Sequence, residues 1–480
     1  MVLFSVVVLF LCAGILTPKE MLEGFSNKGM ITVALLFLVS EGIRQSGTLG
    51  QVIKKLLPQG KTTVFKAQLR ILPSVAFISA FLNNTPVVVI FAPIIKHWAK
   101  SVKLPATKFL IPLSYVTILG GICTLIGTST NLVVHGMILE AGYEGFTMFE
   151  LGKVGIFIAI AGIIYLFIFS KRLLPDARPD TAVPDEEVEE GEKLHRVEAV
   201  LGARFPGINK KLSDFNFQRH YGAEVKEIKT RNGQRYVDHL EDVVLREGDT
   251  LVVMADDTFI PTWGESSVFV LLTNGNDPDT SGKKKRWLAL ILLVLMIVGA
   301  TVGELPATKE MFPDIKLDMF FFVCITTIIM AWTNIFPARK YTKYISWDIL
   351  ITIACAFAIS KAMVNSGVAD CVAGFIIGLS DDYGPHVLLA ILFVITNLFT
   401  ELITNNAAAA LAFPLALSIS AQLGVSPTPF FVVICMAASA SFSTPIGYQT
   451  NLIVQGIGNY KFTDFVRIGL PLNIITVSYT

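Results

Sequence analysis

The stretch Phe81-Leu82-Asn83-Asn84-Thr85 places two adjacent amides inside a long apolar segment. Leu402-Ile403-Thr404-Asn405-Asn406 repeats this polar interruption about 320 positions later. A helix that crosses lipid with two adjacent asparagines is costly unless the backbone turns there. We therefore predict that segments 62–98 and 385–422 are re-entrant helical hairpins with the asparagines at their tips. Two ordinary spans with buried amides are the alternative interpretation.

A second interruption follows each hairpin. Gly127-Thr128-Ser129-Thr130-Asn131-Leu132 divides the apolar segment 107–137, and Gly447-Tyr448-Gln449-Thr450-Asn451-Leu452 divides segment 429–457. Polar breaks at matching places in two halves of a chain are typical of secondary transporters built from inverted repeats. Unwound helix with free carbonyls is one interpretation of each glycine, and tight helix packing is the other. The final asparagine of each motif either belongs to the site or only caps the following half-helix.

The composition excludes most soluble classes. Hydrophobic residues make up 53% of the chain, charged residues only 16%, and the mean hydropathy is +0.61. A soluble protein of this length needs far more charge to cover its surface. The formal net charge of +1 indicates no nucleic-acid partner, and the six scattered cysteines read as small buried hydrophobes. Because the sequence contains no nucleophile–base pair and no metal-ligand cluster, we predict that the protein is not an enzyme.

Other apolar segments predict ordinary membrane spans, namely 2–17, 29–47, 150–173, 287–304, 318–334, 347–365 and 465–480. Met1 to Leu16 resembles a signal peptide in length, but it lacks a basic n-region and a small-residue cleavage site. We therefore interpret it as a membrane helix. A span needs about 20 residues, so the last segment is expected to be a truncated C-terminal helix.

Charged residues orient these spans. Lys54 and Lys55 precede the first hairpin, and Lys171 and Arg172 end the span that closes the first half. Acidic residues such as Asp381 flank the second hairpin. By the positive-inside rule the first hairpin opens to the cytoplasm and the second to the outside. The two halves are therefore predicted to be inverted relative to each other.

A polar region separates the halves. Residues 176–194 are rich in acidic residues and proline, which predicts a solvated linker. The following residues alternate in short β-type runs, with a turn at Asn232-Gly233, and predict a small cytoplasmic α+β domain. The predicted strands are Val197–Val200, Glu224–Ile228, Thr250–Met254 and 266–274. The predicted organisation is a first membrane half (1–175), the linker (176–194), the soluble domain (195–282) and a second membrane half (283–480).

Amides, hydroxyls and glycine carbonyls dominate the predicted breaks. Amide N–H groups, hydroxyls and half-helix N-termini are donors for an oxyanion, and exposed oxygens are ligands for sodium. Sodium would offset the charge of an anion inside a low-dielectric site. Capping of the hairpin turns is the other interpretation of the tip asparagines. Glu401 is the acid inside the second hairpin and is a candidate ion or proton site.

These motifs resemble the divalent anion:sodium symporter family of the ion transporter superfamily, which also contains citrate and arsenite carriers. That family has a Ser-Asn-Thr motif at the tip of each re-entrant hairpin and a broken helix after it. Here Asn83 and Thr404 replace the serines and Asn406 replaces the second threonine. Ser129-Thr130 and Gln449-Thr450 stand where dicarboxylate carriers often have prolines.

The resemblance implies an elevator-type carrier, usually dimeric, with sodium as the coupling ion and no covalently bound cofactor. It assigns the anion to one set of side chains, which is Asn84, Thr85, Asn405, Asn406, Thr130 and Thr450. It assigns sodium to a partly shared set, which is Asn83, Asn84, Gly127, Thr404, Asn405 and Gly447. The additional hydroxyls and amides fit sulfate at least as well as a dicarboxylate.

The soluble region is similar to the C-terminal domain of regulators of potassium conductance (RCK), also called the TrkA C-terminal domain. The similar stretch runs from Phe205-Pro206-Gly207 through His220-Tyr221-Gly222 to Leu245–Leu251. This resemblance implies either a domain that binds a small-molecule regulator or a purely structural dimerisation module.

The sequence thus predicts an all-α polytopic membrane protein with inverted repeats and two re-entrant hairpins, plus a small cytoplasmic α+β domain. The expected function is sodium-coupled transport of sulfate, or next a dicarboxylate, across the cytoplasmic membrane of a bacterium. Two alternatives stay open. One is a proton-coupled anion or arsenite exporter that uses Glu401. The other is an ion channel or potassium-uptake subunit regulated by the RCK-like domain.

Overall fold

The computed structural model describes residues 2–58, 60–176, 195–202, 204–230, 234–256, 259–263, 268–273, 283–312, 315–337, 339, 341–378 and 385–479. Apart from Asp176, the expected linker 176–194 lies outside these residues. The Asn232-Gly233 turn and Asp381 also lie outside them.

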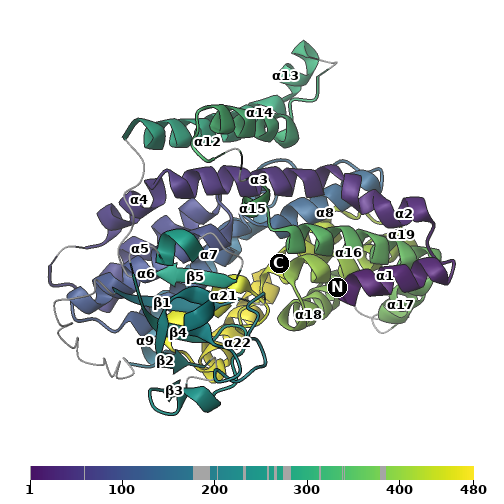
Figure 1. The fold of residues 1–480 in the computed structure, drawn as a ribbon. Helices are drawn as coiled ribbons and strands as arrows, with labels where there is room; N and C mark the ends of the chain where they lie inside the picture. Colours follow the sequence, from purple (N-terminus) through teal and green to yellow (C-terminus); the bar gives the residue numbers. More distant parts are fainter. Residues whose placement is uncertain are drawn as a thin grey trace.

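The first helical region runs from the N-terminus to Leu173 (Figure 1). Its elements are α1 (Val2–Cys12), α2 (Pro18–Glu23), η1 (Gly24–Ser26), α3 (Lys28–Gln45), α4 (Thr48–Leu56), α5 (Val64–Ser79), α6 (Asn84–Ser101), η2 (Ala106–Lys108), α7 (Leu110–Gly121), α8 (Ser129–Glu140) and α9 (Gly152–Leu173).

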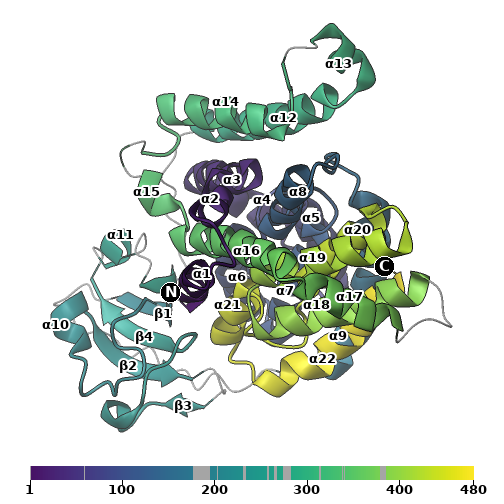
Figure 2. The same cartoon turned by 90° about the vertical axis from the view of Figure 1, so that its right-hand side faces the viewer.

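The second helical region follows the sheet and ends at Tyr479. Its elements are α12 (Lys283–Gly303), α13 (Pro306–Met311), α14 (Met319–Trp332), α15 (Tyr341–Tyr344), α16 (Trp347–Asn365), α17 (Val368–Gly378), α18 (Pro385–Leu402), α19 (Asn405–Leu423), α20 (Thr428–Ser439), α21 (Gln449–Gly458) and α22 (Phe462–Tyr479). The α12–α14 pair packs along α3, and the sheet lies on another side of the helical body, next to α21 (Figures 1 and 2).

The first helix is shorter than the predicted span 2–17. It ends at Cys12, and Gly14 then adopts a left-handed conformation with φ +72°. Thr17 starts a new helix with a capping box, because its side chain accepts from the Glu20 N–H and the Glu20 carboxylate accepts from the Thr17 N–H. These local signals outweigh the continuous hydrophobicity from which the longer span was predicted.

Several helices carry the features of membrane spans. Five described segments are long and apolar enough to cross a bilayer, and they are Pro18–Gln45, Gly152–Leu173, Lys284–Gly303, Trp347–Asn365 and Asn405–Leu423. On α9 the exposed side chains Ile156, Ile160, Ile164 and Ile168 recur every fourth residue and so share one face. An exposed apolar face of this length fits contact with lipid. The fold is that of a mostly helical, polytopic membrane protein.

Two helices form the centre of the helical body. Every residue of α7 is buried, and α19 is buried along most of its length. A helix that is apolar all round is expected to be enclosed by other helices. Around α7 lie α5, α6, α9 and α21, and around α19 lie α8, α16, α17, α18 and α20. The body therefore encloses α7, which ends at the first helix break, and α19, which begins at the second polar tip.

The part of the chain between the two helical regions forms a five-stranded sheet. Its strands are β1 (His195–Leu201), β2 (Glu224–Lys229), β3 (Arg235–Tyr236), β4 (Thr250–Ala255) and β5 (Phe269–Thr273), in the order β3-β2-β4-β1-β5 with antiparallel neighbours. The short elements α10 (Phe217–Tyr221), η3 (Leu240–Asp242) and α11 (Phe259–Trp263) connect them. Phe205, Phe215, Tyr221 and Phe269 pack as an aromatic cluster in its separate core. We call residues 195–273 the sheet unit.

A charged network crosses the sheet unit. The Glu198 carboxylate on β1 lies 2.9 Å from the Lys96 ammonium of α6 and 3.4 Å from the Lys229 ammonium of β2. Burial by itself would raise the pKa of Glu198, but the two ammonium groups outweigh it and lower the pKa to about 2. The folded protein therefore stabilises the charged form of this carboxylate.

This depressed pKa predicts acid-dependent stability. Glu198 should contribute stability above its ordinary pKa of 4.5, and the contribution should disappear as pH falls from there through about 2. We expect Glu198→Gln to lower the melting temperature of the detergent-solubilised protein at neutral pH, with a difference from wild type that shrinks on acidification. Glu224→Gln, which removes an exposed partner of Lys226, is the matched control and should change little at any pH. A constant Glu198→Gln difference across the whole range would contradict this prediction.

Candidate functional site

The two polar tips have the same internal structure. At the first tip, between α5 and α6, the Ser79 hydroxyl donates to the Asn84 Oδ1 at 2.8 Å. At the second tip, between α18 and α19, the Thr400 hydroxyl donates to the Asn405 Oδ1 at 3.2 Å. In both cases the asparagine is the first residue of the second helix, and its oxygen is held by a hydroxyl from the last turn of the first helix. This leaves the amide nitrogen of each asparagine free to donate elsewhere.

The two helix breaks also share one hydrogen-bonding pattern. Between α7 and α8, the Asn131 amide nitrogen donates to the carbonyls of Gly121 and Thr124, at 3.3 and 2.9 Å. Between α20 and α21, the Asn451 amide donates to the carbonyls of Ser441 and Thr444, at 2.8 and 3.1 Å. Both side chains are fully buried. They satisfy carbonyls that lose their helical partners at the break, which is a structural role.

Each tip packs tightly against the break of its own half. The Thr124 hydroxyl donates to the Ala80 carbonyl, and the Thr444 hydroxyl donates to the Glu401 carbonyl at 3.3 Å. A Cβ added at Gly121 would lie 2.6 Å from the Asn84 Oδ1 and 3.2 Å from the Gly127 carbonyl oxygen. Glycine is therefore required for this approach, which gathers several oxygens in one place.

The second half gathers oxygens in the same way. A Cβ added at Gly447 would lie 2.1 Å from the Ser441 hydroxyl and 2.5 Å from the Thr400 carbonyl oxygen. Ser441 occupies the position equivalent to Gly121, so this half contains one more hydroxyl than the first. Thr400, whose carbonyl lies at this glycine, also holds the Asn405 Oδ1 through its hydroxyl, so the second tip and the second break meet here.

Tyr448 joins the two halves. Its hydroxyl accepts from the Asn84 amide nitrogen at 2.6 Å and lies 3.2 Å from the Thr128 hydroxyl. The Asn405 side chain lies beside the same hydroxyl. The tyrosine is only 8% exposed, so the tips of both hairpins and the first break meet at one buried hydroxyl. The sequence motif contains Tyr448 at the position equivalent to Thr128, but no role was predicted for it. Its position inside the repeated motif could have identified it as a candidate site residue.

The residues that follow each tip asparagine cross to the other half. The Asn406 Oδ1 accepts from the hydroxyls of Thr130, at 3.1 Å, and Ser129, at 3.3 Å. The Thr85 hydroxyl lies 3.4 Å from the Gln449 Oε1. Each hairpin therefore contacts the helix that begins after the opposite break. Thr85 therefore lies beside Gln449, which follows Tyr448, and Asn406 lies beside Thr130, two residues after Thr128.

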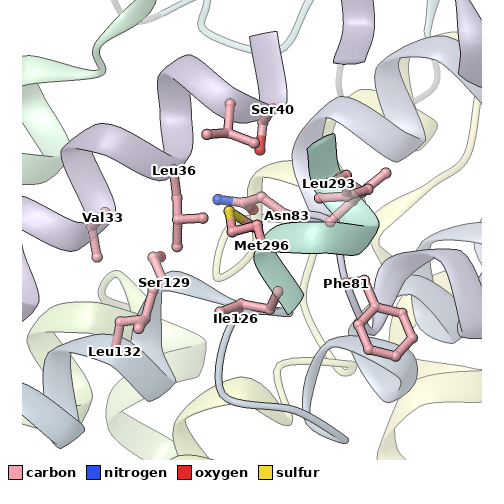
Figure 3. Close-up of a pocket in the computed structure, with 12 residues that line it drawn as sticks. Val33, Leu36, Ser40, Phe81, Asn83, Ile126, Ser129, Leu132, Leu293 and Met296 are labelled. Carbon is pink, nitrogen blue, oxygen red and sulfur yellow. The ribbon is translucent and has the colours of Figure 1, made fainter. Parts of the chain in front are cut away.

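Three other predicted residues point elsewhere. The Thr450 hydroxyl bonds the Ser114 hydroxyl of α7 at 2.8 Å. Asn83 lines a separate small cavity, where it projects toward Leu36 and Met296, between α3 and α12 (Figure 3). Thr404 is exposed. Thr450 and Asn83 thus have neighbours other than Tyr448.

Glu401 lies beside the second tip with three hydrogen-bond donors. Its carboxylate accepts from the Ser443 N–H at 2.8 Å, the Asn473 amide at 3.0 Å and the Ser441 hydroxyl at 3.3 Å. These partners come from the break and from α22, so the carboxylate ties three elements together. Its link to Ser441 places it next to the oxygens around Gly447.

The site is neutral apart from this carboxylate. Neutral amides and hydroxyls can donate to an oxyanion, and their oxygens can bind a hard cation such as sodium. Within the described ranges, no group of three or more His, Cys, Asp or Glu side chains is placed to hold a metal ion. The arrangement suits reversible binding of small ions better than a chemical reaction.

Polytopic helices with paired polar breaks near their middle define a membrane transporter. Comparison with known proteins leads to the same class. The family model described as Citrate transporter (CitMHS) matches residues 1–418 and 311–480. The chain belongs to this family, and transport rather than enzymatic catalysis is its function.

Several relatives carry transporter names. An uncharacterized transporter of Synechocystis sp. is 30% identical over 98% of this chain and 90% of its own length. The sodium/sulfate cotransporter 2 of Chlamydomonas reinhardtii is 30% identical over 58% of this chain and 31% of its own length. The sodium-dependent dicarboxylate transporter SdcS of Staphylococcus saprophyticus is 25% identical over 29% of this chain and 26% of its own length.

The Tyr448 contacts predict a measurable loss of stability. Tyr448→Phe removes the hydroxyl and leaves the buried amide of Asn84 without this acceptor, which should cost about 1–3 kcal/mol. We expect a lower melting temperature for the variant in detergent. Tyr143→Phe, which changes a more exposed tyrosine that packs edge-to-face against Phe431, is the matched control and should melt with the wild type. Equal melting temperatures for both variants would show that the Tyr448 hydroxyl does not hold the tips together.

Proposed function

We propose that this protein is a secondary active transporter of a small divalent anion, with sulfate first and a dicarboxylate next. The observation that carries the proposal is the meeting of both hairpin tips at the buried Tyr448 hydroxyl. Neutral donors that converge from two halves suit an oxyanion, because they bind its oxygens without a fixed charge that would slow its release. The names of the Chlamydomonas and Staphylococcus relatives support both substrates.

We assign the anion to the polar residues around Tyr448. Asn84 and Asn405 supply amides, while Thr85, Asn406 and Thr130 extend the site through their contacts across the halves. Thr450 stays in this proposed set as a residue that would reach the anion only after leaving Ser114. Tyr448 is an addition to the set, since its hydroxyl can donate to an anion as well as accept from Asn84.

We propose two sodium sites, one for each half. The first comprises the oxygens near Gly127 together with Asn84, and the second comprises those near Gly447 together with Asn405. Asn83 and Thr404 stay in the proposed sodium set as tip residues, although their side chains lie away from these oxygens. Sodium favours oxygen ligands, and two bound cations would offset the charge of a divalent anion.

The sequence resemblance supports further proposals. We propose that the two halves are inverted repeats with re-entrant hairpins, that an elevator motion carries the site across the membrane, and that the protein works as a homodimer. The matched hydrogen bonds of Asn131 and Asn451 support the repeat. A bacterial cytoplasmic membrane, with the sheet unit on the cytoplasmic side, remains the proposed location.

We propose that the sheet unit is an RCK C-terminal-like domain that binds a small-molecule regulator. A cavity of about 350 Å³ supports this assignment, and its size is within the range of small-molecule sites. Its lining residues are Thr230, Gln234, Tyr236, His239, Asp242, Val243, Val244, Arg246 and Asp249. A purely structural role in dimerisation is the other outcome.

Sulfate uptake tests the proposal directly. Vesicles containing the purified protein should accumulate labelled sulfate when an inward sodium gradient is imposed, and much less with potassium in place of sodium. Unlabelled thiosulfate and succinate in excess should compete if the site accepts divalent anions as a class. Uptake without dependence on sodium would remove the coupling proposal. Uptake of none of these anions would remove the substrate proposal.

The two tip asparagines provide a second test. We expect Asn84→Ala and Asn405→Ala each to abolish sulfate uptake, because each removes an amide donor from the centre of the site. The amount of protein in the membrane should stay normal. Asn365→Ala, at an exposed asparagine that bonds the Ile15 carbonyl, is the matched control and should keep its uptake. Near-normal uptake by either tip variant would reassign that asparagine to capping of the turn.

Glu401 supports one alternative, which is proton coupling. Its carboxylate touches the Ser441 hydroxyl beside the second proposed sodium site, so a proton there could replace the cation. In that case a pH gradient would drive uptake without sodium, and Glu401→Gln would abolish it. Sodium-driven uptake that survives Glu401→Gln would exclude this alternative.

A further inference from the structure

The sheet unit contacts two of the helices that begin at the proposed anion site, α6 and α21. On α6, Lys96 donates to the two carboxylate oxygens of Glu198, at 2.9 and 3.0 Å. Asn84 is the first residue of the same helix, so the ion pair lies about 18 Å farther along α6 at 1.5 Å per residue. One continuous helix, α6, therefore connects the first tip to the sheet unit.

The second contact is with α21, which begins directly after Tyr448. A Cβ added at Gly248 would lie 2.6 Å from the Leu452 Cδ1, and one added at Gly456 would lie 2.6 Å from the Thr250 hydroxyl oxygen. Gly248 has φ +84°, so the turn before β4 also needs glycine for its conformation. Val200 of β1 is fully buried in the same apolar core as α21. The sheet unit is thus packed against α21 without space between them.

Further ion pairs inside the sheet unit hold Glu198 in place at this interface. Glu198 also contacts Lys229, which is only 3% exposed, and Lys229 lies 3.8 Å from Glu227. Glu227 is itself paired with Arg235. A partly buried network on a rigid sheet holds its geometry far better than an isolated surface pair.

The sheet unit also touches a helix from the other part of the body. Arg204 pairs with Asp348 in the first turn of α16, but these side chains are 49% and 71% exposed. An exposed pair of this kind contributes about 0–1 kcal/mol and breaks easily. The contacts with α6 and α21 are therefore the strong ones, and the contact with α16 is the weak one.

The helices fall into two groups according to whether they carry residues of the proposed site. The sheet unit follows α9, which packs with α5, α7 and α22, and it precedes α12, which packs with α3 and α14. We call α5–α9 together with α18–α22 the site helices, because they carry all the tip and break residues. The remaining long helices, including α3, α12, α14 and α16, form the flanking helices. The sheet unit therefore lies on the chain between the two groups but is held by the site helices.

We infer that the sheet unit is a rigid attachment of the site helices and moves with them, while its Arg204–Asp348 contact with the flanking helices opens during transport. This inference rests on the proposed function and its elevator motion. It makes the interface with α6 and α21 the surface through which anything bound to the sheet unit acts on the anion site. A regulator that strengthened the α16 contact would stop the movement of the site.

Two engineered crosslinks test the inference in the full chain. The first joins Lys96→Cys to Glu198→Cys, and the second joins Arg204→Cys to Asp348→Cys, each with a short bis-maleimide. None of the six native cysteines lies in the sheet unit. Variants that carry only one of the two introduced cysteines, treated with the same reagent, are the matched controls. Sodium-driven sulfate uptake is measured in vesicles before and after crosslinking.

We expect the 96–198 crosslink to leave uptake unchanged, because the two positions move together. The 204–348 crosslink should abolish uptake, because it ties the site helices to the flanking helices. Loss of uptake with the first crosslink, or full uptake with the second, would overturn the inference. Failure of the proposed function would look different, since the untreated and single-cysteine proteins would then take up no sulfate. A spin-label distance between the sheet unit and α16 that stays constant with and without sodium and sulfate, in a protein that transports, would also overturn it.

Discussion

The structure depends on how it satisfies backbone carbonyls at two helix breaks in an apolar interior. An unwound segment inside a membrane protein exposes carbonyls that no water can reach, and each unsatisfied group costs several kcal/mol. The buried amides of Asn131 and Asn451 each bond two such carbonyls. The breaks can therefore persist as defined structures, and the polar tips have fixed partners against which to pack.

Glycine then decides how close the tips come to the breaks. Gly121 and Gly447 have backbone or side-chain oxygens within 2.6 Å of the place where a Cβ would be. This close approach concentrates amide, hydroxyl and carbonyl oxygens into two small regions, one in each half. The Tyr448 hydroxyl then joins them across the interface.

The sheet unit adds a separate β-sheet core to this arrangement. Its attachment uses a partly buried ion pair on α6 and close glycine packing on α21, and both helices begin at the site. The depressed pKa of Glu198 reflects the same ammonium groups that hold the interface. The ion pair with α6 and the depressed pKa of Glu198 therefore share one physical cause, which is the Lys96 ammonium beside this carboxylate.

Much of the architecture could be predicted from the sequence. Long uncharged runs predicted a polytopic membrane protein, because only lipid accommodates them. Alternating runs predicted four strands of the sheet, β1, β2, β4 and β5, since side chains on a strand alternate between its faces. The two-residue strand β3 was not predicted. Short-range signals were weighed less well. The Thr17 capping box ends the continuity of the first predicted span, although its residues were present in the sequence.

The sequence by itself determined the membrane class, the repeated polar tips and breaks, and the residue types available for binding ions. Only the tertiary structure decided which of those residues meet. It placed Asn406 with Thr130 of the other half, Thr450 with Ser114, and both tip asparagines on Tyr448. The reason is that these contacts join positions hundreds of residues apart. Their partners depend on how the helices pack, and local sequence patterns carry no record of that packing.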